Sequence, residues 1–109
     1  MTLAVTVEQG NKQFQGAFKE TWVVSMTGLD FANAATGSGT FASIDVTVPG
    51  LALGDMLIGI SVGVDTVDAV IYGATTAANT MTLTLLNNTA GAVDLASTTG
   101  KMLIGRPAW

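Results

Sequence analysis

The sequence predicts an all-β domain, an antiparallel β-sandwich or jelly-roll-like barrel of about seven or eight strands. Three observations lead to this prediction. Apolar and polar residues alternate with a period of two in several separate segments, as they do in strands with one buried face. Turn-forming residues separate these segments at intervals of roughly 8–14 residues. Only residues 32–35 have the composition of a helical turn.

The first 20 residues differ from the rest and are expected to form an N-terminal arm or an edge strand. Leu3, Val5 and Val7 alternate with smaller residues, and a polar, turn-rich stretch follows them. A single short strand is not stable alone, so this apolar face needs a partner. That partner is either the same domain or a neighbouring subunit. We favour an arm on the neighbour over an internal edge strand.

Residues 21–109 are expected to form a single β-sandwich domain. A strand over residues 41–48 ends at Pro49-Gly50, because proline lacks the ladder donor and the pair favours a type II turn. The mostly apolar segment 55–64 is expected at the centre of a sheet. In residues 80–86, threonines alternate with a Met and leucines that need a core. The other expected strands are residues 21–26, residues 67–75 and a last one through Met102 and Ile104.

Alternation within these strands also assigns the core. Val70, Tyr72 and Ala74 share one face of their strand. The side chains expected in the core are Ile44, Val46, Val48, Leu57, Val70, Met81, Leu83, Leu85 and Met102.

Composition excludes several classes of function. The chain has no histidine and no cysteine, which removes the commonest general base, thiol nucleophiles, disulfides and nearly all zinc chemistry. Its four basic residues are scattered, so no basic groove for nucleic acid is expected. No apolar stretch reaches the roughly 18–20 residues of a membrane-spanning helix. The polar residues at positions 8, 11 and 12 interrupt any signal peptide. We expect no enzyme, cofactor, metal site or membrane contact.

Low charge points instead to an interface. Charged residues make up 11% of the chain, against roughly 25% in an average soluble domain. Hydrophobic residues make up 49%, and the mean hydropathy is +0.51. Apolar surface of this kind usually marks a site of protein contact. We therefore expect much of the surface to be covered in the working state.

The few polar residues that resemble a site have simpler explanations. Asp65 and Asp68 bracket a short turn, and a calcium loop needs six to eight oxygens rather than two neighbouring carboxylates. They are expected to act as turn formers. Asp55 stands at a strand entry, where an acid usually caps a turn or faces solvent. Asn87-Asn88-Thr89 matches a glycosylation sequon, which is a weak signal.

The aromatic residues leave two alternatives open. Trp22, Tyr72 and Trp109 would stack on sugar rings if they were exposed together, which is the carbohydrate-binding alternative. Individually, such residues more often lie in a core or an interface. Trp109, after Pro107, is expected to dock on its own sandwich or on a neighbour.

Two stretches carry a family resemblance. They are Val48-Pro49-Gly50-Leu51-Ala52-Leu53-Gly54-Asp55 followed by Ala77-Ala78-Asn79-Thr80, and the run from Leu86 to Ser97. This pattern, over about residues 41–106, resembles small β-sandwich proteins encoded beside the head genes of tailed bacteriophages, which include capsid decoration or cement proteins. The motifs are turns and strands rather than a chemical signature. The first 40 residues lie outside the resemblance.

The resemblance implies a protein of the outer capsid surface that bridges coat subunits, commonly as a trimer or dimer. The expected partners are the major capsid protein and further copies of this chain, with a trimer preferred. A carbohydrate-binding module of a head or tail fibre is the alternative, and a small tail-tube or connector component is a weaker one. The candidate interface residues are Leu3, Val5, Val7, Trp22 and Trp109.

Overall fold

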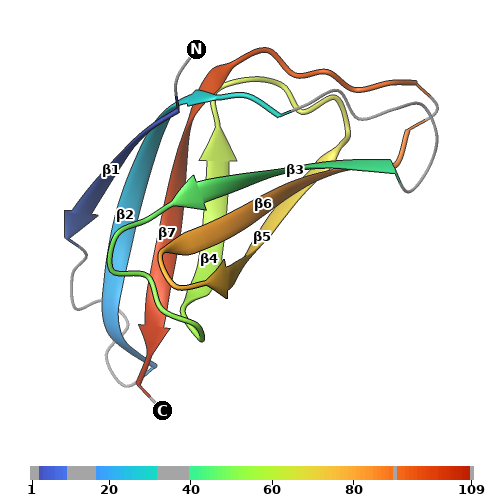
Figure 1. Ribbon diagram of the computed structural model, residues 1–109. Helices are drawn as coiled ribbons and strands as arrows, with labels where there is room; N and C mark the ends of the chain where they lie inside the picture. The colour runs from blue at the N-terminus through green and yellow to red at the C-terminus, as the bar shows by residue number, and fades with distance from the viewer. Residues whose placement is uncertain (1–2, 10–16, 32–39, 90, 109) are drawn as a thin grey trace.

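The computed structural model describes residues 3–9, 17–31, 40–89 and 91–108. Within these ranges the chain is all-β, as the sequence predicts. It forms two antiparallel sheets packed into a β-sandwich (Figure 1). The seven strands are β1 (Ala4–Gln9), β2 (Phe18–Leu29), β3 (Thr40–Thr47), β4 (Met56–Val62), β5 (Val70–Ala77), β6 (Thr80–Asn87) and β7 (Thr98–Pro107).

The two sheets differ in size and direction. The four-stranded sheet has the order β1-β2-β7-β4, and the three-stranded sheet has the order β3-β6-β5. In Figure 1 the three-stranded sheet lies in front, and its strands cross those of the sheet behind it at a steep angle. Every pairing is antiparallel. The larger sheet therefore joins the two ends of the chain, because β2 and β7 are its central pair.

The core lies between the two sheets. Val24 and Met102, which face each other across β2 and β7, are buried, as are the inward side chains of β6. Of the nine residues expected in the core, six are buried and two, Ile44 and Leu57, pack against it while partly exposed. The ninth, Val70, is 52% exposed, so its assignment to the core was wrong.

Pairing with β6 explains why β5 turns its more apolar face outward. Leu83 points into the core and lies opposite Gly73 of β5. A Cβ on Gly73 would lie 2.8 Å from Leu83 Cδ2 and 2.9 Å from Leu57 Cδ2. The missing side chain thus makes room for two leucines from the opposing sheets. With Gly73 facing inward, Val70 and Tyr72 face outward.

The apolar strand β4 is also not where its composition predicts. It lies at an edge of the larger sheet, with β7 as its paired neighbour, whereas residues 55–64 were expected at a sheet centre. Its ladder is interrupted by a register shift between Leu57 and Gly59. Leu57, Ile60 and Val62 are partly buried and pack against the core, whereas Met56 and Ile58 are 45% and 39% exposed. The apolar run thus predicted a strand, but it did not predict burial, because β4 lies at a sheet edge and part of its apolar surface meets solvent.

The N-terminal strand belongs to the same domain. β1 pairs with β2 along its whole length, from Ala4 opposite Thr27 to Gln9 opposite Trp22. Leu3 and Val5 are partly buried and pack against the core. Of the two alternatives for this segment, the structure has the internal edge strand. The helical turn expected at residues 32–35 lies outside the described residues.

Candidate binding surfaces

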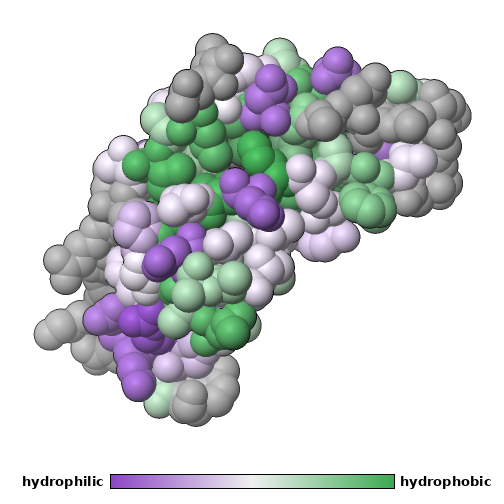
Figure 2. Space-filling model, in the orientation of Figure 1, coloured by the Kyte–Doolittle hydropathy of each residue, from purple (hydrophilic) through white to green (hydrophobic). Residues whose placement is uncertain are grey.

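The outward face of the three-stranded sheet is called the front face below. Among the described strands, it carries the bulkiest exposed apolar side chains. Phe41 is 66% exposed, Tyr72 53% and Val70 52%. Register places Phe41, Leu86 and Val70 in one row across β3, β6 and β5. Figure 2 shows this side of the molecule as apolar patches separated by nearly neutral residues and a few hydrophilic ones. The result is a flat face on which aromatic and aliphatic groups meet solvent.

Hydroxyl groups fill the middle of the front face and bond to one another across the strands. Ser43 Oγ and Thr84 Oγ1 lie 3.1 Å apart. Thr82 Oγ1 donates to Asp45 Oδ1 at 2.7 Å and lies 2.8 Å from the hydroxyl of Thr76. Cross-strand pairs of this kind hold side chains in fixed positions on the sheet. The front face is therefore ordered before a partner arrives, which lowers the entropic cost of binding.

A loop between β3 and β4 closes one end of the sandwich, and Asp55 holds it. Its Oδ2 accepts a hydrogen bond from the Ala52 amide at 2.9 Å, which is the turn-capping role expected from the sequence. Its carboxylate also pairs with Arg106, whose Nε and Nη2 donate to Oδ1 and Oδ2 at 3.0 and 2.8 Å. Arg106 Nη2 reaches the Gly50 carbonyl at 2.8 Å as well. Asp55 is thus buried and ion-paired, which residue spacing did not indicate.

The pKa of Asp55 follows from this environment. Burial by itself raises the pKa of the carboxyl group. The hydrogen bonds from Arg106 and the Ala52 amide, together with the positive charge of Arg106, outweigh burial and lower the pKa below its ordinary value of 3.8. The Asp55 hydrogen bond correspondingly raises the pKa of Arg106. The pair is charged at neutral pH and acts as a fixed structural contact.

Trp22 lies at the same end and does not form an aromatic platform with Tyr72. The guanidinium carbon of Arg106 lies 4.8 Å from the centre of the Trp22 ring, a cation–π contact. A cavity of about 230 Å³ adjoins it, lined by Glu20, Trp22, Arg106 and residues 48–51. Tyr72 is on the outward face of the other sheet. The structure thus separates these two residues, and Trp109 lies outside the described residues.

The aspartates of the β4–β5 turn do act as turn formers. Asp65 Oδ1 accepts a hydrogen bond from the Val67 amide at 2.9 Å. The Ala69 amide bonds to the Thr66 carbonyl at 3.0 Å, and Val67 and Asp68 between them have φ values of 54° and 65°. Positive φ at both central residues is the mark of a type I′ turn. Val67 is 57% exposed at the tip of this turn.

The sequon residue Asn87 has a structural role. Its side chain is fully buried, its Nδ2 donates to the Gly91 carbonyl at 2.8 Å, and its Oδ1 accepts from Thr89. A glycan needs the Asn nitrogen at the surface. The folded chain therefore does not offer Asn87 for modification.

The structure spreads the candidate interface residues over several places. Val5 lies in β1 and Leu3 directly precedes this strand, whereas Trp22 lies under Arg106 and opposite Gln9 at the far end of β1. Val7 pairs with Val24 in the backbone ladder, and nothing further is described of its side chain. Leu3, Val5 and Trp22 do not gather into one exposed surface, and the side chains of Val7 and Trp109 lie outside what the structure describes. The front face, which sequence reasoning missed, does gather, and Gly73 is the signal that would have shown it.

Comparison with known proteins adds no relative. No family model, curated protein or solved structure matches the chain. Within the described ranges no group of three or more carboxylate, His or Cys side chains is placed to hold a metal ion. In the same residues no helix is long and apolar enough to cross a membrane.

Proposed function

We propose that this chain is a structural protein without catalytic activity that binds the outer surface of a bacteriophage capsid as a homo-oligomer and stabilises contacts between coat subunits. Its partners are then the major capsid protein and further copies of itself. The resemblance of residues 41–106 to decoration proteins supplies the biological setting. The observation that carries the proposal is the front face, an ordered and nearly uncharged sheet surface whose largest side chains meet solvent.

The size of the front face bears on how such binding works. Three strands spaced about 4.8 Å apart and about 27 Å long cover roughly 400 Å². A stable interface buries about 800 Å² on each partner, so one front face binds weakly by itself. Several front faces joined in one oligomer bind far more tightly, because the later contacts form within one complex. Repeated coat subunits present the matching sites. Binding energy then adds up over the capsid surface.

Cosedimentation with empty capsids of the parent phage tests the proposal. We expect the wild-type protein to sediment with the capsids and to raise the temperature at which they disrupt. Phe41→Ser and Tyr72→Ser should each weaken binding by about tenfold or more, because they remove the aromatic anchors of the contact. Leu53→Ser is the matched control, since Leu53 is 70% exposed on the β3–β4 loop, away from the front face.

Two outcomes would count against the proposal in different ways. Wild-type protein that stays in the supernatant at micromolar concentration overturns the capsid-binding function. Front-face variants that bind as well as the Leu53→Ser control leave the function standing and move the contact to another surface. Sugar binding is the competing explanation for exposed aromatic residues, and a glycan array with the same variants separates the two.

A further inference from the structure

The outward face of the four-stranded sheet contains a shallow groove that the proposed capsid contact does not use. Two adjoining hollows of about 290 and 410 Å³ share Ser61 and Lys101 in their lining. Register places Lys101 of β7 between Ser25 of β2 and Ser61 of β4. The groove, called the back groove below, is lined by Val23, Ser25, Gly59, Ser61, Lys101 and Leu103.

The shape of the back groove comes from Gly59 on the edge strand. No atom lies within 4 Å of the position that a Cβ on Gly59 would take, so the strand leaves open space there. Half-buried Val23 and Leu103 form an apolar floor beside it. A small apolar group that enters the groove would thus meet side chains below it and open space at the edge.

Lys101 gives the back groove a positive charge that no described carboxylate pairs with. The side chain is exposed, and within the described residues the one ion pair joins Arg106 to Asp55. The hydroxyls of Ser25 and Ser61 are neutral. A carboxylate is the group that complements an uncompensated ammonium beside hydroxyl donors.

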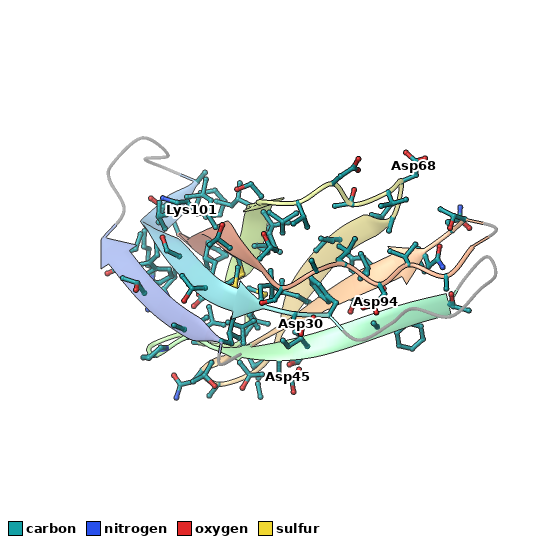
Figure 3. All side chains as sticks on the ribbon, turned by 90° about the horizontal axis from the view of Figure 1, so that it is seen from above. Asp30, Asp45, Asp68, Asp94 and Lys101 are labelled. Carbon is teal, nitrogen blue, oxygen red and sulfur yellow. The ribbon has the colours of Figure 1, made fainter. Side chains whose placement is uncertain are left out.

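The chain itself carries a protrusion with the complementary chemistry. The β4–β5 turn presents exposed Asp65 and Asp68 on either side of exposed Val67. Figure 3 shows Lys101 and Asp68 on opposite halves of the molecule, so the tip of the turn points away from Lys101 of its own copy. It can reach the groove of a second copy.

We propose that the β4–β5 turn of one copy docks in the back groove of the next. Val67 then packs on Val23 and Leu103, and the two aspartates face Lys101. The contact joins two different surfaces, so it is heterologous, and repetition closes it into a ring when the rotation between copies divides a full turn. The inference rests on the homo-oligomer in the proposed function. It leaves the front faces, on the other side of the sandwich, free for the capsid.

Charge reversal with light scattering tests the contact. Wild-type protein should be oligomeric at micromolar concentration and should dissociate as salt is added. Lys101→Glu and the pair Asp65→Lys with Asp68→Lys should each weaken association by about tenfold or more. An equal mixture of the two variants should associate again, because each reversed groove then meets a reversed turn. Lys19→Glu and Asp30→Lys with Asp94→Lys are controls of equal charge at other exposed positions.

The outcomes separate this inference from the proposed function. An oligomer unchanged by Lys101→Glu, or a wild-type monomer at 100 times the working concentration, overturns the docking. If a monomeric wild-type protein loses capsid binding on Lys101→Glu, the groove takes a carboxylate of the coat, which also overturns it. If the mixture reassociates but the wild-type protein fails to sediment with capsids, the result supports the docking and overturns the capsid-binding function.

Discussion

At the scale of single residues, the pair of Asp55 and Arg106 has the clearest energetic role. Asp55 is 6% exposed, and its carboxylate fixes the β3–β4 loop to Arg106 of the last strand, 51 positions later in the chain. A buried pair of this kind need not add stability relative to apolar residues, but removing one partner leaves the other charge without compensation. The loop therefore depends on both residues being present and charged.

We expect Asp55→Asn to lower the free energy of unfolding by about 2 kcal/mol at neutral pH. The folded-state pKa of Asp55 lies below its ordinary value of 3.8. The stability that this carboxylate contributes is therefore fully present above pH 3.8 and is lost as the pH falls through the lower folded pKa. Urea unfolding between pH 7 and pH 2 measures both effects. Asp94→Asn, at an exposed site, is the control, and an equal acid loss in all three proteins would contradict the prediction.

The backbone conformation of Val67 is unfavourable for its β-branched side chain. A β-branched residue at a φ of 54° is strained, whereas Asn adopts this conformation readily. Val67→Asn should raise the stability of the dilute monomer by about 1 kcal/mol. Val67→Thr keeps the branched Cβ and changes the polarity, so it should give no such gain. Thermal melts of the three proteins at low concentration decide the matter. Equal melting temperatures would show that the turn is not strained.

At the scale of elements, strand identity followed from the sequence, while strand orientation and neighbours did not. Alternation in residues 80–86 placed Met81, Leu83 and Leu85 in the core, where they are fully buried. The same rule failed for β5, because its more apolar face is the outward one. Hydropathy indicates how favourable it is to bury a side chain. Gly73 instead indicates a place where side chains of the two sheets, Leu83 and Leu57, need space. Which face of β5 points inward is decided by how the two sheets pack together.

The candidate surfaces were harder to predict than the strands. The pairing of Phe41, Leu86 and Val70 into one row depends on the register of three strands, and no local pattern contains it. The partner of Asp55 was likewise hidden by sequence distance. What composition did indicate was the low charge of the surface, which is the property that the front face shows.

Gly73 and Gly59 provide a matched test of this argument. Gly73→Ala would place a methyl group 2.8 to 3.0 Å from Leu83, Leu57 and the Thr82 carbonyl, so we expect a loss of about 1–3 kcal/mol. Gly59→Ala meets no atom within 4 Å and should change stability little. Chemical denaturation of both variants measures the difference. Similar losses of stability in the two variants would contradict this argument. They would then come from replacing a glycine in a strand, and not from the lack of space beside position 73.

At the scale of the whole molecule, the larger sheet joins the beginning of the chain to its end. β7 lies between β2 and β4, and Trp22 pairs with Ile104 across the central ladder. By contrast, β1 is an edge strand with one paired neighbour in its sheet. The larger sheet therefore cannot form before β7 is in place. Proteins dominated by pairings between residues far apart in the sequence fold slowly, typically in milliseconds to seconds.

Removing the two terminal strands should therefore have unequal effects. Deletion of residues 98–109 removes the centre of the larger sheet together with Met102 and Ile104, both buried, so we expect no cooperative unfolding transition. Deletion of residues 1–9 removes an edge strand and the partly buried Leu3 and Val5, so the domain should stay folded with a lower melting temperature. Circular dichroism melts show both results.

The edge-strand position predicts a lower melting temperature even for a monomer, whereas an N-terminal arm on a neighbour would weaken association and leave the monomer melt unchanged. A monomer that loses residues 1–9 and melts as before would therefore contradict the pairing of β1 with β2.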